Sequence, residues 1–439
     1  MFEQITEEML DFVGASVTPF HAVNSICDTL TSNGYVRLEE GQEWNIECDG
    51  KYYVTRNGSS VIAFHTGNSA KDYSYNIVAT HLDSPTFKLK ENAAVYCGEK
   101  YSRLNVEGYG GMICSTWLDR PLSVAGRVIV KDTNNRLCTK LVNLDRDLLL
   151  IPNAAVHMNR EINDGFSYNK QVDLLPLLSG DKCTGGINKL IADELSCDVT
   201  DIVGSDLFLY ARVAPSVWGA NFEFVSSARL DDLQCTFAAL KALTDTNASS
   251  AINVMACFDN EEVGSTTKQG ADSTFLQDTL MRINQSLGGT NETYLRALSD
   301  SFMLSADNAH AVHPAHPEYT DESNRVYMNE GVVIKSHAGQ KYTSDAMSMA
   351  IVRQLASYAD VPIQFFANRS DKVGGSTLGN ISAGHVSVKC ADIGAPQLAM
   401  HSSYETCGMK DTYYLWKLMK SLYMTRLSYS EGGCIDFLT

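Results

Sequence analysis

The stretch AINVMACFDNEEVGS, at residues 251–265, constrains the fold more than any other part of the sequence. An apolar run of strand length ends in three carboxylates and a glycine, a pattern typical of a buried strand that delivers acids to the rim of a sheet. If the segment stays extended, Glu261 and Glu262 point in opposite directions, so one can bind a metal while the other handles a proton. The alternative is a solvated loop, because exposed glutamate is the norm.

The length and the local patterns predict two domains. A chain of 439 residues exceeds the size at which single hydrophobic cores stop growing. From about residue 89 to 225, short β-like runs alternate with turns that contain Gly and Asn, which indicates a β-rich domain. We therefore expect an α/β domain formed by residues 1–88 and 226–439, with the β-rich domain of residues 89–225 inserted into it.

Local signals place the main elements of the α/β domain. Apolar periodicity predicts helices over residues 5–15 and 19–33 and a final amphipathic helix over 410–425. The residues on either side of Asn57-Gly58 read as the two strands of a hairpin. Further strands are expected over these segments: residues 75–80, 251–258, 302–306 and 386–391.

Charge and composition exclude several classes of partner. With 35 basic and 52 acidic residues the formal charge is -17, which argues against nucleic acid and anionic membranes as partners. No stretch approaches 18 uninterrupted apolar residues, and the N-terminal residues lack the pattern of a secretory signal. The 12 cysteines show no CxxC spacing and no disulfide framework. We expect a soluble, cytoplasmic protein.

Residues 75–85 offer a first candidate metal ligand. The apolar run at residues 75–80 leads directly into His81, and Asp83 lies on the same face of an extended chain. A carboxylate in that position can orient a metal-binding imidazole. The competing interpretation is ordinary turn chemistry, since Asp-Ser-Pro is a common turn sequence.

Other acids and histidines occupy equivalent positions, at the end of an apolar strand or at the start of a helix. The collected candidates are His81, Asp231, Glu262, Asp307 and His401. Two imidazoles and three carboxylates suit zinc, with manganese or cobalt as possible substitutes. If one carboxylate bridges, the set forms two metal sites, and Glu261 is left to act as general base in metal-assisted hydrolysis.

The chain resembles the M18 metallo-aminopeptidases, the aspartyl-aminopeptidase-like group, in motifs that cover nearly its whole length. The matching runs are THLDSP at 80–85, YGG at 109–111, STWLDRPL at 115–122, VHMNR at 156–160, RLDDL at 229–233, FDNEEVGS at 258–265, SADNAHAVHP at 305–314 and PQLAMHS at 396–402.

The resemblance implies an α/β/α zinc-exopeptidase domain with two zinc ions per subunit. It implies that Asp231 bridges the ions, that His81 and Asp307 bind one of them, and that Glu262 and His401 bind the other. It also implies that Glu261 is the general base and that Asp83 orients His81.

The resemblance further implies roles for residues that the local patterns leave unassigned. Taken alone, His157 reads as a structural histidine. In M18 enzymes the histidine of this motif reaches a neighbouring subunit's active site, residues 89–225 form a dimerisation and lid domain, and dimers assemble into a dodecamer. Lys335, Tyr342 and Met400 are expected in the substrate pocket, where a lysine favours acidic N-terminal residues through a charge-assisted hydrogen bond.

We therefore expect a zinc aminopeptidase that removes N-terminal residues from peptides, with Asp and Glu as one possible preference. Family members differ in this preference, and residues 335–345 match neither group. Two alternatives remain: another dizinc exopeptidase or amidohydrolase of this fold, such as a carboxypeptidase or deacylase, and a catalytically silent peptide-binding assembly protein.

Overall fold

The structure is a computed structural model that describes the chain except for residues 70–71, 99, 183–184, 248–249 and 439. The chain divides into two compact units. Unit 1 comprises Met1–Asp83, Ser216–Met400 and Thr406–Thr439, and unit 2 comprises Ser84–Pro215 and His401–Glu405. Unit 2 is thus an insertion in the chain of unit 1, with a short second segment near residue 400.

Unit 1 is built around a nine-stranded mixed sheet. Its strands, in spatial order, are β1 (Val36–Leu38), β2 (Lys51–Arg56), β3 (Ser60–His65), β13 (Ile252–Phe258), β4 (Tyr75–His81), β14 (Phe302–Ala306), β18 (Lys389–Gly394), β16 (Val332–Ser336) and β17 (Ile363–Ala367). The four central strands β13, β4, β14 and β18 are parallel to one another. Their carboxyl ends therefore share one edge of the sheet.

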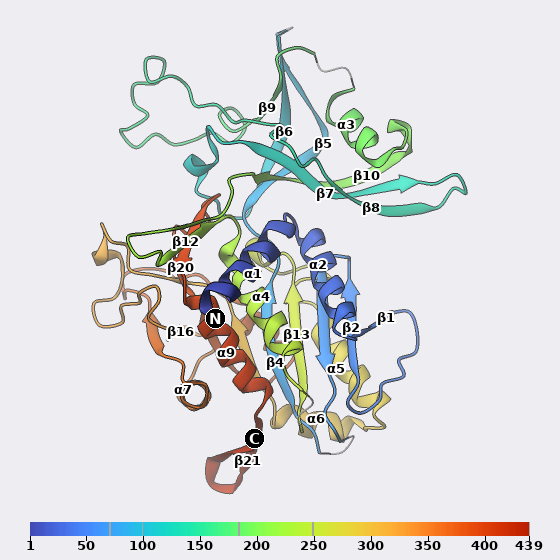
Figure 1. Cartoon of the computed structure of the whole chain (residues 1–439), viewed down its shortest axis with the longest axis vertical. Helices are drawn as coiled ribbons and strands as arrows, with labels where there is room; N and C mark the ends of the chain where they lie inside the picture. The colour runs from blue at the N-terminus through green and yellow to red at the C-terminus, as the bar shows by residue number, and fades with distance from the viewer. Residues whose placement is uncertain (70–71, 99, 183–184, 248–249, 439) are drawn as a thin grey trace. The chain divides into compact units, whose positions relative to one another are not determined.

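Helices cover both faces of this sheet. One face packs against α1 (Phe2–Ala15), α2 (Pro19–Ser32), α4 (Leu230–Thr244), α7 (Ala346–Ala359) and α9 (Asp411–Tyr423). The other face packs against α5 (Phe275–Ser286), α6 (Asn291–Ser299) and α8 (Leu378–Ser382). Figure 1 shows α1, α4 and α9 side by side over the sheet. The expected three-layer α/β/α arrangement is confirmed.

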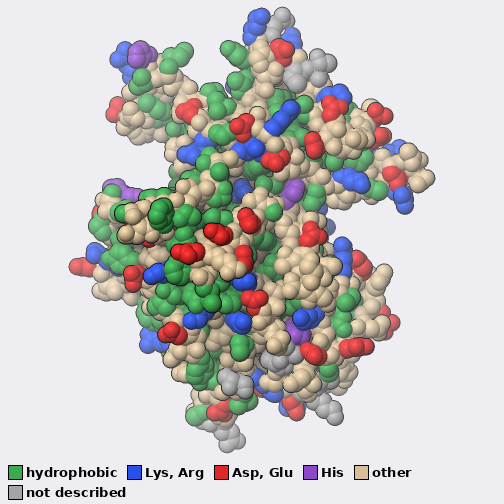
Figure 2. All heavy atoms as spheres, viewed as in Figure 1, with side chains coloured by type: hydrophobic (Ala, Val, Ile, Leu, Met, Phe, Trp, Pro, Cys, Tyr) green, Lys and Arg blue, Asp and Glu red, His purple; other side chains and the backbone are tan. Residues whose placement is uncertain are grey.

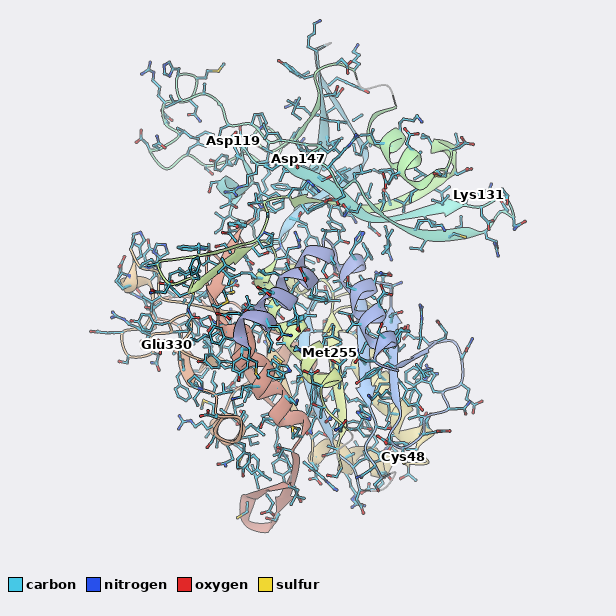
Figure 3. The ribbon with its side chains drawn as sticks, viewed as in Figure 1. Cys48, Asp119, Lys131, Asp147, Met255 and Glu330 are labelled. Carbon is cyan, nitrogen blue, oxygen red and sulfur yellow. The ribbon has the colours of Figure 1, made fainter. Side chains whose placement is uncertain are left out.

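The side chains of β13 show why this segment is a central strand. Every residue of β13 is buried. Met255 and Cys257 pack into the core on the α4 side, whereas Val254 and Ala256 pack into the core on the α5 side. Both faces of the strand are thus apolar, as expected for a parallel strand covered by helices on both sides. Met255, which lies on β13, is labelled in Figure 3.

Two buried asparagines fasten the last helix to the sheet. Asn76 of β4 donates from Nδ2 to the carbonyl oxygens of Leu422 and Thr425, at 2.9 and 2.8 Å. Asn253 of β13 donates to the carbonyl of Tyr423 at 2.9 Å. These carbonyls lie at the C-terminal end of α9, where helix geometry leaves backbone acceptors without intrahelical partners. The side chains of neighbouring strands therefore cap the helix end.

The predicted hairpin and terminal helices are present. β2 and β3 pair antiparallel around Asn57 and Gly58, which both have a positive φ, as the tight hairpin turn requires.

A five-stranded sheet has the order β11 (Ser216–Trp218), β12 (Phe224–Ser227), β20 (Glu405–Gly408), β19 (Pro396–Leu398), β15 (Ala309–His310). The chain ends in a hairpin of β21 (Arg426–Ser430) and β22 (Cys434–Leu438).

Unit 2 is rich in β-structure and has its own core. Its six-stranded sheet has the order β8 (Leu137–Asn143), β7 (Leu122–Lys131), β10 (Ile202–Ala211), β5 (Thr86–Cys97), β6 (Tyr101–Tyr109), β9 (Leu177–Ser179). The helix α3 (Gly186–Leu195) packs against this sheet through Ile187 and Ile191.

The described residues also bear on membrane spans and on surface charge. Among them, no helix combines the length and the apolar composition needed to cross a bilayer. Acidic and basic side chains are interspersed over the face of the molecule shown in Figure 2.

Candidate active site

The carboxyl ends of three parallel strands bring the predicted acids and His81 together. His81 is the last residue of β4 and lies opposite Phe258, the last residue of β13. Asp307 directly follows β14, which pairs with the other side of β4. Because parallel strands end at one edge of the sheet, segments that are far apart in the sequence meet there.

The ligand atoms lie within metal-binding distance of one another. One group consists of His81, Asp231 and Asp307, and a second consists of His81, Glu261 and Glu262; in each, the candidate ligand atoms all lie within 4.8 Å of one another. Oxygens of Asp231 and Glu262 are also within 4.8 Å. All five residues belong to unit 1.

The start of α4 fixes His81 from one side. Asp231 and Asp232 have non-helical backbone angles, and the peptide bond between them is cis. Asp231 Oδ1 lies 3.4 Å from His81 Nε2. The backbone N–H of His81 donates to Asp232 Oδ2 at 3.2 Å, and Thr236 Oγ1 donates to the carbonyl of His81 at 3.0 Å. His81 therefore has little freedom to move.

The acids after β13 lie on a tight turn, so the expectation of an extended chain there is wrong. Glu261–Val263 forms a single 3₁₀ turn between Asn260 and Gly264, which both have a positive φ. The carboxylate of Asp83 accepts the N–H groups of Glu261 and Glu262, each at 3.1 Å. This pairing lets Asp83 hold the turn in place, because the first N–H groups of such a turn have no partner within it.

Asp83 also faces the imidazole of His81. Its backbone carbonyl lies 3.0 Å from His81 Nδ1, and its carboxylate oxygen Oδ1 lies 3.5 Å from the same atom. The shorter contact is to the carbonyl. Nδ1 is thus directed toward Asp83, while Nε2 faces Asp231.

The crowded carboxylates alter one another's protonation. Burial and the neighbouring acids Asp307 and Glu262 raise the pKa of Glu261 to about 8. Burial raises the pKa of Asp232 well above its usual value. For His81, burial alone would lower the pKa, but the hydrogen bonds to Asp231 and Asp83 outweigh it and raise the pKa well above 6.5. Burial and the proximity of like charges therefore favour the protonated forms of Glu261 and Asp232.

Asp307 is held by its backbone and by a lysine. A side chain on Gly394 would place its Cβ 2.0 Å from the carbonyl oxygen of Asp307, so only glycine permits this approach of β18. Lys335 Nζ lies 3.7 Å from Asp307 Oδ2. Burial raises the pKa of Asp307, while Lys335 acts in the opposite direction.

The arrangement suits a metal of intermediate hardness. One imidazole nitrogen and several carboxylate oxygens converge in a buried region, and these are ligands that zinc accepts. Burying that many acids without a cation is costly, because each charge loses its hydration. The donor set of unit 1 therefore fits zinc.

The remaining predicted residues belong to both units. His401 belongs to unit 2, where its Nδ1 lies 3.0 Å from the carbonyl oxygen of Gly111. His157 is exposed on a turn of unit 2. In unit 1, Met400 is half-buried in a turn, and the Tyr342 ring is buried beside Lys335 and Phe366.

Three residues near the candidate site were assigned no role by the sequence analysis. Asp232 contacts His81, Asn308 accepts a hydrogen bond from Lys335, and Asp392 is a fully buried carboxylate. Asp392 accepts from the backbone N–H of Thr343 at 2.5 Å and from Thr377 Oγ1 at 2.5 Å. A second aspartate next to Asp231 is a usable signal for Asp232. Asn308 and Asp392 have no such local signal.

Comparisons with known proteins identify related chains. Residues 12–423 match the family model described as "Aminopeptidase I zinc metalloprotease (M18)". A probable M18 family aminopeptidase 2 from Clostridium novyi is 49% identical, over 96% of this chain and 98% of its own length. Aspartyl aminopeptidase 1 from Schizosaccharomyces pombe is 38% identical, over 98% of this chain and 96% of its own length.

Solved structures show the same fold. The Ape4 chain in a complex with Nbr1 superposes with a TM-score of 0.93 at 37% identity, covering 97% of this chain and 86% of that chain. The S. cerevisiae mApe1 dodecamer superposes with a TM-score of 0.82 at 25% identity, covering 96% of this chain and 97% of that chain.

Proposed function

The chain belongs to the M18 family of zinc aminopeptidases, and from this premise we propose that it uses two metal ions, with Glu261 as general base, to release acidic N-terminal residues from peptides. The observation that carries the proposal is the convergence of His81, Asp231, Asp307 and Glu262 around Glu261 at one edge of the central sheet.

The ligand assignment follows the two groups of side chains. We assign His81 and Asp307 to one ion, Glu262 to the other, and Asp231 to both. Proximity supports this choice, because Asp231 lies within 4.8 Å of His81 and Asp307 and also of Glu262. His401 completes the second site in this proposal, on the strength of its place in the motif PQLAMHS.

Glu261 and Asp83 have separate tasks in the proposed reaction. Zinc, when bound, supplies a Lewis acid that polarises the scissile carbonyl and acidifies water. Glu261 takes a proton from the attacking water and passes it to the leaving amine. Asp83 positions Glu261 by accepting the backbone N–H of the turn. It also orients the imidazole of His81 through the contact between Nδ1 and its own carbonyl oxygen. Tyr342 and Met400 are assigned to the substrate pocket.

The substrate proposal concerns the first residue of the peptide. The relative from S. pombe is named an aspartyl aminopeptidase and shares 38% of its residues with this chain over nearly the full length. That similarity supports a preference for Asp and Glu over neutral residues. Lys335 and the other residues of the pocket are the candidates for recognising the acidic side chain of the substrate.

We further propose a homo-oligomer in which unit 2 forms the dimer contact and His157 enters a neighbouring subunit's site. The dodecameric structure of a protein 25% identical over most of both chains supports this assembly. The cytoplasm is the proposed location, consistent with the acidic composition and with the scattered cysteines.

A panel of aminoacyl substrates tests the activity and the preference. The expected result is faster hydrolysis of N-terminal Asp and Glu than of Leu, Met or Lys, and loss of hydrolysis when the α-amino group is acetylated. An acetylated peptide cut as fast as the free one would indicate a deacylase or other amidohydrolase instead. Elemental analysis of the active protein should find close to two zinc ions per chain.

A further inference from the structure

Asp392 is a buried carboxylate to which the proposed reaction gives no task. It belongs to β18, its side chain is fully buried, and the strand register pairs it with Ser305 of β14 and Lys335 of β16. A carboxylate in such a place loses its hydration, so it persists only where hydrogen bonds replace the lost water. The donors around Asp392 therefore indicate what this residue holds.

The donors come from two loops that are separate in the sequence. Oδ2 of Asp392 accepts the backbone N–H of Thr343 at 2.5 Å and the hydroxyl of the same residue at 2.7 Å. Oδ1 accepts the hydroxyl of Thr377, the residue before α8. In addition, the backbone N–H of Asp392 donates to Ser344 Oγ at 2.9 Å. Hydrogen bonds to a carboxylate are stronger than those between neutral groups, so one buried side chain joins the loop after β16 to the loop before α8.

Other contacts join the same two loops. Lys341 Nζ donates to the carbonyl oxygen of Gly374 at 3.0 Å. A Cβ on Gly379 would lie only 3.0 Å from Thr343 Oγ1 and 3.1 Å from Asp392 Oδ1, so a glycine at this position lets α8 approach the carboxylate. The sequence thus provides both the donors and the space for this junction.

The loop after β16 also carries Tyr342. Its ring is buried, packs against Phe366, and has its centroid 5.4 Å from Nζ of Lys335. The N–H of Thr343 belongs to the peptide group that begins at Tyr342, and a peptide group is planar and rigid. By accepting this N–H, Asp392 restrains the backbone to which the Tyr342 side chain is attached.

We propose that Asp392 is a positioning residue, which holds Tyr342 in the substrate pocket through its hydrogen bonds to Thr343 and Thr377. This inference rests on the proposed function, which places Tyr342 and Lys335 in that pocket. A side chain that is already fixed loses little conformational freedom when the substrate binds, and it contacts the substrate in one defined position. Loosening the two loops should therefore impair catalysis without removing any group assigned to the substrate or the metal.

Thr377→Val tests the inference away from the pocket residues themselves. Valine has nearly the size of threonine but cannot donate to Asp392, so Oδ1 loses this donor. We expect kcat/KM to fall about 10- to 100-fold, because a misplacement of about 1 Å can cost that much, while zinc content stays parental. Thr377→Ser keeps the hydroxyl and should restore most of the activity. Parental kcat/KM in Thr377→Val would overturn the inference.

Thr343→Val is the second variant, in case the buried Thr377→Val protein does not fold. It removes only the hydroxyl, and Oδ2 of Asp392 keeps the backbone N–H as a donor. The fold should tolerate this change better, and kcat/KM should fall by a smaller factor. A folded Thr343→Val protein with unchanged kcat/KM would contradict the proposed role of Asp392.

A double-mutant cycle separates positioning from a merely structural role. Tyr342→Ala removes the side chain that Asp392 holds. If Asp392 acts through Tyr342, adding Thr377→Val to Tyr342→Ala lowers kcat/KM no further. If the double variant instead shows the product of the two separate losses, Thr377 acts independently of Tyr342 and the inference is wrong. Parental activity in Tyr342→Ala, by contrast, would remove Tyr342 from the pocket and contradict the proposed function itself.

Thr274→Val is the matched control. Thr274 precedes α5 as Thr377 precedes α8, and its hydroxyl likewise donates to an aspartate, Asp278 Oδ2, at 2.7 Å. The control should keep parental kcat/KM and zinc content. A loss of kcat/KM equal to that of Thr377→Val would show a general effect of threonines at helix starts, and would overturn the inference.

Discussion

At the scale of single residues, the adjacent acids Glu261 and Glu262 have different surroundings despite their shared turn. Both are close enough to His81 for a common metal group, yet only Glu262 is also within 4.8 Å of Asp231 in a candidate group. Glu261 has a pKa of about 8, raised chiefly by burial. That value, close to neutrality, is what a group that accepts and returns a proton needs.

Glu261→Gln should separate proton transfer from metal binding. The amide keeps the size of the side chain but cannot accept the proton, so kcat should fall about 10²- to 10⁴-fold, the usual contribution of a general base. Zinc content should be unchanged. Glu262→Gln is the comparison: it should lower zinc content, measured by elemental analysis, along with activity. A Glu261→Gln protein as active as the parent would remove Glu261 from the mechanism.

The protonation of His81 predicts how zinc binding depends on pH. Against the effect of burial, the hydrogen bonds to Asp231 and Asp83 raise the pKa of His81 well above 6.5, so they favour the protonated imidazole. A metal ligand must give that proton up, so zinc affinity should fall as pH decreases below the raised pKa and increase as pH rises through it. Calorimetry in buffers of different ionisation enthalpy should record proton release on zinc binding at pH 7. Binding without proton release would contradict the protonated state of His81.

At the scale of elements, the turn after β13 depends on a side chain from another strand. Asp83, two residues beyond β4, accepts both N–H groups at the start of the Glu261–Val263 turn. The two neighbouring strands are thus joined at their carboxyl ends by one carboxylate. The spacing between the proposed general base and the proposed metal ligands therefore depends on this contact.

Asp83→Asn should loosen the turn. The two N–H groups donate to different oxygens of Asp83, and the amide of Asn carries NH2 in place of one of them. Glu261 and Glu262 therefore lose a fixed position, and zinc affinity should fall about 10- to 100-fold, as for other residues that orient metal ligands. Chelator competition measures the change. Asp132→Asn is a matched control, since Asp132 also accepts two backbone N–H groups, those of Asn134 and Arg136, within a turn of unit 2. The control should bind zinc like the parent.

The same turn shows what the sequence predicts and what it does not. Apolar runs that end in an acid or a histidine correctly indicated β4, β13 and β14, because burial on both faces leaves a continuous hydrophobic signal. Which acid faces which partner depends on a 3₁₀ turn held by Asp83, a contact between residues 178 positions apart. Periodicity within one segment carries no information about such a contact. Asn308 and Lys335 are further examples, since their pairing depends on the sheet order.

At the scale of the whole molecule, the proposed reaction depends on a second subunit. His81, Asp231, Glu262 and Asp307 belong to unit 1, whereas His157 and His401 belong to unit 2. His157 is exposed on a turn of unit 2. Activity should therefore depend on assembly.

Mixing inactive subunits tests the role of His157. In the proposed reaction, His157→Ala lacks the histidine that would act in a neighbouring subunit, and Glu261→Gln lacks the base that would act in its own site. Co-assembled subunits should regain activity, because some sites receive a parental His157 and a parental Glu261 from different chains. Hydrolysis rates are measured on mixed assemblies verified by mass. Mixed assemblies without any regained activity would mean that His157 acts within its own chain or not at all.

The strand order of the central sheet has a consequence for how the protein is made. β13 lies between β3 and β4, and residues 82–251 separate it from β4 along the chain. A ribosome therefore releases β3 and β4 long before the strand that joins them exists. Since Glu261, Glu262 and Asp307 are synthesised later still, the emerging polypeptide has no complete hydrolytic centre. The proposed centre can therefore form only after synthesis has passed Asp307 and β13 has entered the sheet between β3 and β4.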